Sequence, residues 1–280
     1  MGKQLKVKRL FVGDYVTLIF FFILLFFTLF PLLWMFLASL KTSAEINLPK
    51  PTFFPKNVFF GNYKKIFTDQ YFLGYFRNSV IVAVGVTIIA VSGSMLMGFV
   101  FAKFKFPLKN VFFYMILATI MIPSESTIVP LYSLARKLNM INTYQGMMLP
   151  SIISSFGIFY MKQNMEQIPD SLIEAAKIDG AGNWYIFFHI IVPLSTSAIS
   201  VLALLLFLTE WSAYLWPLIM ASKKEMFLLE IGLTYLQDEY IIDYGMMMAG
   251  CVVALIPALI LYIFFRNNIM EGIASTGIKG

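Results

Sequence analysis

Residues 167–193 read Gln-Ile-Pro-Asp-Ser-Leu-Ile-Glu-Ala-Ala-Lys-Ile-Asp-Gly-Ala-Gly-Asn-Trp-Tyr-Ile-Phe-Phe-His-Ile-Ile-Val-Pro, a polar insert in an otherwise apolar chain. Pro169 ends any preceding helix, because it lacks a backbone N–H and restricts the residue before it. Ser171 stands three residues before Glu174, which predicts a capping box that starts a new helix. Gly180 then permits a turn before a second apolar run. The stretch therefore predicts a helix, a turn and a second helix lying between two membrane spans.

The first of these helices has one shallow face. Leu172, Ala175, Ala176 and Asp179 follow one another at spacings of three, one and three residues, which places them on one side of a helix. Because the side chains of the two adjacent alanines are short, another protein surface could dock against that side of the helix at close range. The structural alternative is that the alanines are simply good helix formers and that Gly180 only stops the helix.

Composition identifies the class of protein. The chain has 280 residues, of which 59% are hydrophobic and 13% charged, whereas about 25% charged residues is typical of a soluble domain. The mean hydropathy is +0.79. We therefore expect an integral membrane protein that forms one domain over residues 1–280.

Several kinds of site are excluded or disfavoured. Cys251 is the only cysteine and His189 the only histidine, so an internal disulfide is impossible and a Cys/His or Ser/His catalytic or metal cluster is disfavoured. We expect His189 to be structural rather than part of a proton relay. The sequence contains no Gly-x-x-x-x-Gly-Lys-Ser/Thr motif, so any ATP would be bound by another subunit. The net charge of +6 is spread over many loops, which argues against a nucleic-acid partner.

Six apolar runs match or approach the length of about 20 residues that crosses a bilayer. The first is too long for the core of a signal peptide. We expect Pro31, Pro123 and Pro150 to lie within spans, and residues 41–77 to form a mixed loop on the outer face. The six predicted spans cover residues 15–40, 78–102, 110–134, 143–161, 195–216 and 244–265.

Six spans place both ends of the chain on the same side of the membrane. The numbers of Lys and Arg on the two sides are nearly balanced. Four basic residues precede the first span closely, however, and only Lys41 follows it closely. This local asymmetry favours a cytoplasmic N-terminus.

The same central stretch resembles the EAA loop of ABC-importer permeases through Glu174-Ala175-Ala176, Gly180, Ile190 and Pro193. Val192 departs from the usual leucine, which is a mild apolar exchange. Several further segments are similar to the sugar permeases of the maltose-type branch: Ile178-Asp179-Gly180-Ala181, Pro193-Leu194, Met121-Ile122-Pro123, Ile128-Val129-Pro130-Leu131-Tyr132, Glu210-Trp211, Leu215-Trp216-Pro217-Leu218, Glu239-Tyr240, Asp243-Tyr244-Gly245 and Gly277-Ile278-Lys279-Gly280.

The resemblance implies an all-α, six-helix permease of the type I importer architecture in a bacterial inner or plasma membrane, surrounded by lipid and with both termini cytoplasmic. Its implied partners are a second permease, two ATPase subunits and an extracytoplasmic solute-binding protein. No cofactor is implied on this chain, because ATP and Mg would be bound by the ATPase subunits. The implied cargo is a sugar, an oligosaccharide or a related polyol or glycoside.

The resemblance also implies roles for particular residues. Coupling to the ATPase subunits would run through the loop at about 167–193, by Glu174, Ala175, Ala176, Asp179 and Gly180. Glu174 would bring its carboxylate to the ATPase surface; the structural alternative is that it only completes the capping box with Ser171.

Four residues are candidates for the translocation pathway: Glu125, Glu210, Trp211 and Tyr214. Ionisable groups within spans are costly and usually face a bundle interior or water, and a carboxylate can accept hydrogen bonds from sugar hydroxyls. Glu125 could instead reach the outer interface. The aromatic residues could instead form a belt at headgroup level.

The acidic segment 217–243 is a candidate for contact with the solute-binding protein. The residues named for this role are Asp238, Glu239, Tyr240 and Asp243. A solvated connector is the structural alternative.

Three other functions stay open at this point. An ABC permease could carry another class of solute. A secondary transporter would show inverted repeats and paired membrane-embedded charges, and no repeat is evident. An intramembrane enzyme would need a catalytic set that one histidine and one cysteine hardly supply.

Overall fold

The computed structural model describes residues 12–236 and 243–277, and every regular element within these ranges is a helix. The all-α prediction is confirmed. The chain divides into two compact units. Unit 1 comprises the chain up to Thr68 together with Leu236–Val253, and unit 2 comprises Asp69–Tyr235 together with the chain from Ala254 onward.

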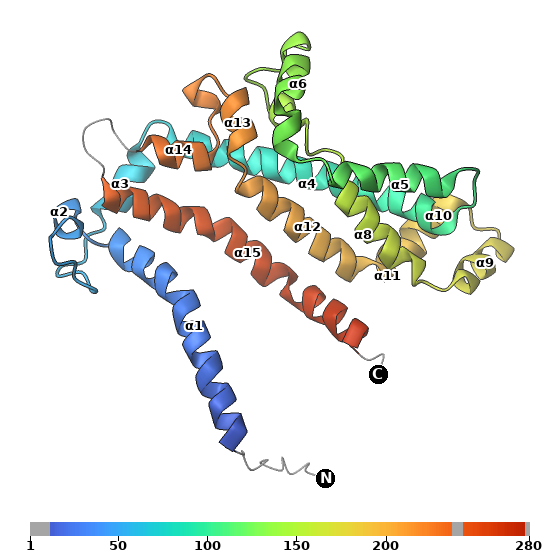
Figure 1. Ribbon diagram of the computed structural model, residues 1–280, viewed down its shortest axis with the longest axis horizontal. Coiled ribbons are helices and arrows are strands. Elements are labelled where there is room, and N and C mark those ends of the chain that lie inside the picture. Colours follow the sequence, from blue (N-terminus) through green and yellow to red (C-terminus); the bar gives the residue numbers. More distant parts are fainter. Residues whose placement is uncertain (1–11, 237–242, 278–280) are drawn as a thin grey trace. The chain divides into compact units, whose positions relative to one another are not determined.

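Unit 1 contains α1 (Val12–Ser39), α2 (Ser43–Ile46), α3 (Gly61–Thr68) and the first residues of α15 (Tyr244–Gly277), which are blue and red in Figure 1. Apolar side chains of α1 are exposed around the helix along most of its length. A helix that is apolar on all sides suits a lipid environment.

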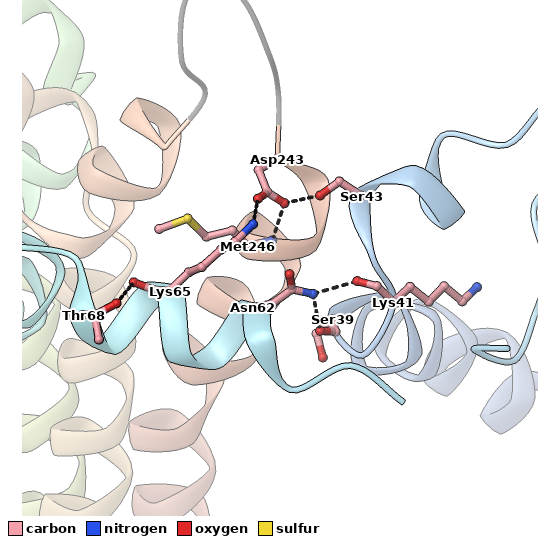
Figure 2. A network of polar contacts seen from close by, with 8 residues as sticks. All are labelled: Ser39, Lys41, Ser43, Asn62, Lys65, Thr68, Asp243 and Met246. Atoms are coloured by element: carbon pink, nitrogen blue, oxygen red, sulfur yellow. Dashed lines mark hydrogen bonds and ion pairs between the residues drawn. The ribbon is translucent and has the colours of Figure 1, made fainter. Parts of the chain in front are cut away.

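A buried asparagine ties the end of α1 to α3. The Asn62 side-chain amide donates to the carbonyl oxygens of Ser39 at 2.8 Å and Lys41 at 2.7 Å, as Figure 2 shows. Gly245, in the first turn of α15, lies against the same amide, since a Cβ there would come within 2.7 Å of Asn62 Nδ2. Residues 41–68 of the loop predicted at 41–77 are therefore partly helical and connected within unit 1, whereas residues 72–77 are already helical in unit 2.

Unit 2 is built along α4 (Phe72–Lys103), and α8 (Ser155–Glu166) packs beside it (Figure 1). The other helices of unit 2, besides the later part of α15 and a 3-10 turn at Lys224–Met226, are α5 (Lys109–Ile120), α6 (Ser124–Lys137), α7 (Tyr144–Met148), α9 (Asp170–Ile178), α10 (Asn183–Ile186), a π-helical turn (Phe187–Ile191), α11 (Val192–Leu194), α12 (Thr196–Trp211), α13 (Leu215–Met220) and α14 (Leu229–Tyr235).

Small residues set the distance between α4 and α8. A Cβ at Gly157 would lie 2.3 Å from Ser94 Oγ, and a Cβ at Gly98 would lie 2.7 Å from the Cβ of Met161. Such close approach is typical of packing between membrane helices. These contacts hold the C-terminal part of α4 against α8, whose own C-terminus precedes the polar insert.

The described residues contain three helices that are long and apolar enough to cross a membrane, or up to five spans if each of two bent helix pairs counts as one. The three are Tyr15–Ser39, Phe72–Lys103 and Tyr244–Asn268. The bent pairs are Lys109–Ile120 with Ser124–Lys137, at 98°, and Asn183–Leu194 with Thr196–Trp211, at 78°.

The prediction of a continuous span over 143–161 is wrong. Residues 149–154 separate α7 from α8, and α8 continues to Glu166. Pro150 lies in this break, where it removes a backbone donor.

Other predicted boundaries also move. The second span begins at Phe72 rather than at residue 78, the helix of the fifth ends at Trp211, and that of the sixth continues to Gly277. Pro123 lies at a break in the third predicted span, between α5 and α6, whereas Pro130 lies inside α6.

Candidate functional site

The polar insert folds as a helix, a turn and a helix, as predicted, but its first helix starts differently. Pro169 is the N-cap of α9, with no side-chain cap hydrogen bond, and Asp170 is the first helical residue. Ser171 therefore lies inside the helix, two positions after the N-cap, and does not cap its free N–H groups. The predicted capping box of Ser171 and Glu174 is wrong.

Lys103, the last residue of α4, holds the start of α9. Its ammonium donates to the Ile168 carbonyl oxygen at 2.6 Å and to Asp170 Oδ1 at 2.7 Å. The Lys103 side chain is only 5% exposed, whereas that of Asp170 is 76% exposed. The hydrogen bond and charge of Lys103 hold the pKa of Asp170 below its ordinary value. A buried cation thus ties the end of a membrane helix to the insert.

Neither Lys103 nor Asp170 was among the residues singled out from the sequence. The available signals were a basic residue closing an apolar run and an acidic residue following a proline. Their pairing spans 67 positions of the chain, so it follows only from the way that α4 and α9 pack.

One face of α9 is buried. Ile173 joins a core cluster formed by α4, α8, α10, the π-helical turn and α12, and Ala176 packs against the edge of that cluster. The buried members of the cluster are Val91, Phe99, Met161, Met165, Ile168, Ile173, Ile186, Phe187, Ile191, Ala198 and Leu202. α9 therefore shares its core with the long helices α4 and α12.

The end of α9 is a Schellman motif. The Ala181 N–H donates to the Ala176 carbonyl at 2.9 Å, and the Gly180 N–H donates to the Lys177 carbonyl at 3.0 Å. Gly180 adopts φ +83°, a left-handed conformation that glycine adopts without steric cost. The predicted turn at Gly180 thus has a specific geometry.

The opposite face of α9 is exposed among the residues that the structure describes. Glu174, Ala175 and Asp179 are exposed, and Ile178 is 86% exposed. Ala176 is half-buried, so the predicted common face is divided between the core and the solvent. The result is a short helix with one side fixed to the membrane helices and the other side open for docking.

Exposed aromatic side chains continue this surface beyond the turn. Trp184 and Phe188 are stacked with ring centroids 6.1 Å apart, and both are exposed. His189 stacks on Tyr185 at 4.1 Å, and its Nδ1 lies 3.1 Å from the Tyr185 carbonyl oxygen. The contacts of His189 are local, in keeping with the structural role expected for it.

The four pathway candidates are placed differently from one another. Glu125 lies exposed in the first turn of α6 and Tyr214 is 42% exposed before α13. Glu210 is buried with the Ser151 side chain as its hydrogen-bond partner.

Trp211 is also buried. Its indole N–H donates to the Ala254 carbonyl at 3.0 Å, and its ring stacks on Phe207. In this structure the Trp211 ring packs inside unit 2, so it is exposed neither to lipid headgroups, as an aromatic belt requires, nor to a solute pathway.

Asp243 lies within unit 1, and its carboxylate is engaged there (Figure 2). It accepts hydrogen bonds from the Lys65 ammonium at 2.6 Å, from the Met246 N–H at 3.1 Å and from the Ser43 hydroxyl. Partial burial acts to raise the pKa of Asp243, but these hydrogen bonds outweigh it and hold the pKa below its ordinary value. Asp243 therefore caps α15, a role that sequence reasoning missed. The other residues named for contact with a binding protein, Asp238, Glu239 and Tyr240, lie outside the described residues.

The segment after Pro217 is not a simple solvated connector. It contains α14, and Leu228, Leu229 and Ile231 are fully buried. The Asn78 amide on α4 donates to the carbonyl oxygens of Glu225 and Phe227 at 2.8 and 3.0 Å. This part of the chain is folded onto α4.

The chain is thus an all-α protein with helices long and apolar enough to cross a membrane and a short helix, α9, that is exposed on one side. The chain belongs to the family described as binding-protein-dependent transport system inner membrane component, which it matches over residues 94–274.

Relatives and solved structures agree with this membership. The chain is 34% identical over 258 residues to the arabinooligosaccharides transport system permease protein AraQ of Halalkalibacterium halodurans, covering 91% of this chain and 92% of that protein. It is 32% identical over 247 residues to the lactose transport system permease protein LacG of Rhizobium radiobacter, covering 88% and 90%.

Its fold is similar to a chain in the crystal structure of a bacterial ABC transporter involved in the import of the acidic polysaccharide alginate. The TM-score is 0.81 at 20% identity, with 96% of this chain and 100% of that chain covered. The predicted resemblance to carbohydrate ABC-importer permeases and the type I permease fold are thereby confirmed. The chain is a multi-pass permease component of an ABC importer, which decides against the secondary-transporter and intramembrane-enzyme alternatives.

Proposed function

We propose that this chain forms one half of the pathway of a bacterial sugar importer, with an oligosaccharide as the cargo. The names of AraQ and LacG support this class of solute. A second permease completes the passage, and a solute-binding protein delivers the sugar from outside the inner or plasma membrane. Both termini are cytoplasmic in this proposal.

Two ATPase subunits bind ATP and Mg and hydrolyse the nucleotide, and α9 carries their movement to the membrane helices. The observation that carries this proposal is the two-sided environment of α9. Its inner side is fixed by Ile173 and by Lys103, while Glu174, Ala175 and Asp179 remain open for docking. A stiff element that couples to a two-state bundle is what such gating requires.

Glu125 and Tyr214 are retained as candidates for the pathway. Both side chains are exposed, and Glu125 accepts only the neighbouring Ser124 hydroxyl among the described residues. A carboxylate and a phenol free to hydrogen-bond suit the hydroxyl groups of a sugar.

The test is ATP hydrolysis by the complete importer reconstituted in liposomes. The solute-binding protein of the same system is added empty or loaded in turn with linear oligosaccharides, disaccharides and a sugar phosphate. We expect loaded oligosaccharide to stimulate hydrolysis and uptake together. Equal hydrolysis with every solute, or stimulation only by the sugar phosphate, would refute the proposed cargo.

A further inference from the structure

The turn between α4 and α5 contains a basic pocket that the transport function does not use. The pocket has a volume of about 330 Å³ and is lined by Lys105, Phe106, Leu108, Lys109, Asn110 and Val111. It has no acidic side chain in its lining. Leu108 adopts φ 59°, so the chain turns sharply here and places the lysines close in sequence on either side of one bend.

Both lysines of this pocket keep hydrogen-bonding capacity. Lys109 donates to the Phe104 carbonyl at 3.1 Å, which leaves two of its three donors. Within the described ranges neither Lys105 nor Lys109 forms an ion pair. Asp170, whose pKa they help to lower, is paired with Lys103 at 2.7 Å. The pocket therefore carries positive charge that no ion pair within the described ranges neutralises.

An apolar groove adjoins the basic pocket. It has a volume of about 490 Å³ and is lined by Met97, Val100, Phe101, Phe106, Phe112, Met115, Ile116 and Thr119. Phe106 lines both hollows. The groove lies between α4 and α5, and Phe112 and Met115 on its rim are about half exposed. The charged hollow and the apolar groove thus share the Phe106 side chain as a common wall.

The length of the groove is a large part of one leaflet of a bilayer. Along α5 the apolar lining extends from Phe112 to Thr119, which is about 10 Å at a rise of roughly 1.5 Å per residue. The hydrocarbon core of a bilayer is about 30 Å thick, so the groove covers about two thirds of one leaflet. Lys105 lies in the turn after the end of α4, and Lys109 is the first residue of α5, so both are at helix ends, where a headgroup would be found.

We propose that the pocket and groove bind an anionic phospholipid, with the phosphate at Lys105 and Lys109 and one acyl chain along the groove. Basic pockets between membrane helices bind anionic headgroups because the negative charge of the headgroup is attracted to the positively charged side chains. The apolar groove selects a lipid over a soluble phosphate. The site lies beside Lys103, so the lipid would sit next to the helix end that holds α9.

The test uses the purified importer in detergent, stripped of lipid and titrated with phosphatidylglycerol or phosphatidylcholine while bound lipid is counted by native mass spectrometry. We expect preferential binding of phosphatidylglycerol. The double variant Lys105→Gln/Lys109→Gln should weaken phosphatidylglycerol binding by about 30-fold, from about fivefold for each lysine, and leave phosphatidylcholine unchanged.

The matched control is Lys223→Gln/Lys224→Gln, which removes the same charge from exposed lysines of another loop. It should bind phosphatidylglycerol like the wild type. Equal binding of the two lipids by the wild type would overturn the proposal, and this comparison needs no variant to assemble. Displacement of phosphatidylglycerol by an equal concentration of inorganic phosphate would assign the pocket to a free anion and would also overturn it.

Discussion

Replacing Lys103 by methionine removes the ammonium that joins α4 to α9 while keeping a similar apolar stem. The Ile168 carbonyl would lose its donor at 2.6 Å, in a residue that is itself buried. Asp170 would lose its partner as well. We expect α9 to detach more often from the end of α4, with the rest of the fold unchanged.

The magnitude follows from the buried bond. A hydrogen bond to a charged donor contributes about 1.5–3 kcal/mol, and a buried carbonyl left without a partner has a similar cost. We assign no energy to the Asp170 contact, because that carboxylate is exposed. The equilibrium for opening α9 should therefore rise by about 10- to 150-fold, at a factor of ten for each 1.4 kcal/mol.

Amide hydrogen exchange in the assembled importer measures this opening. The amides of residues 170–181 should exchange about 10- to 150-fold faster in Lys103→Met than in the wild type. Asp170→Asn should show a much smaller change, because it leaves the bond to Ile168 intact. Lys137→Met is the control, since Lys137 is exposed in the last turn of α6.

Two results would refute the reasoning about Lys103. Unchanged exchange in residues 170–181 would mean that the core cluster alone holds α9. An equal effect of Asp170→Asn would mean that the exposed ion pair, rather than the buried carbonyl, carries the contact.

Four further predictions concern single positions. Gly180→Pro should abolish coupling of ATP hydrolysis to uptake, since proline cannot adopt φ +83° and lacks the N–H that donates to the Lys177 carbonyl. Gly180→Asn should keep most of the coupling. Equal coupling in both variants would contradict the role assigned to the turn at Gly180. Ala176→Leu should leave the protein in the membrane but lower uptake per ATP, because Ala176 lies where α9 meets its core; normal uptake would refute it. Glu174→Gln should weaken ATPase docking in co-purification without lowering thermal stability, because Glu174 caps nothing; undiminished docking would leave its charge without a role. Asp243→Ala should destabilise the first turn of α15 by about 1 kcal/mol, and Asp243→Asn by less, since both acids and amides cap helices; exchange of the 244–247 amides measures this. Because the folded pKa of Asp243 is depressed below 3.8, its contribution should be constant above about pH 5 and be lost as the pH falls from there through the folded pKa, and a loss near neutral pH would contradict the capping role.

The sequence predicted the parts of this protein that depend on local pattern. The order of helix, turn and helix in 167–193 follows from the proline, the alanines and Gly180, which act on their own neighbours. The capping box failed for a local reason too, because Pro169 is the N-cap and the helix starts two residues earlier than it would with Ser171 as the cap. The π-helical turn at Phe187–Ile191 has no comparable signal in the residue pattern.

The parts that could not be predicted depend on distant contacts. Lys103 and Ile168 lie 65 positions apart, and only the packing of α4 against α8 brings them together. Trp211 has the composition of a belt residue, yet its ring is enclosed by Phe207 and its N–H is bound by Ala254. Asp243 looked like a surface acid, but its partner Lys65 comes from a helix near the other end of the chain.

The central claim is that the exposed side of α9 meets a nucleotide-hydrolysing partner in the cytoplasm. The direct measurement places a single cysteine at Ile178, in a Cys251→Ser background, and attaches a short photo-crosslinker to it in the assembled importer. The account predicts an adduct with the soluble ATPase subunit, identified by mass spectrometry, and protection of the cysteine from an impermeant thiol reagent added outside intact cells. An adduct with no ATPase subunit, or rapid labelling from outside, would contradict it.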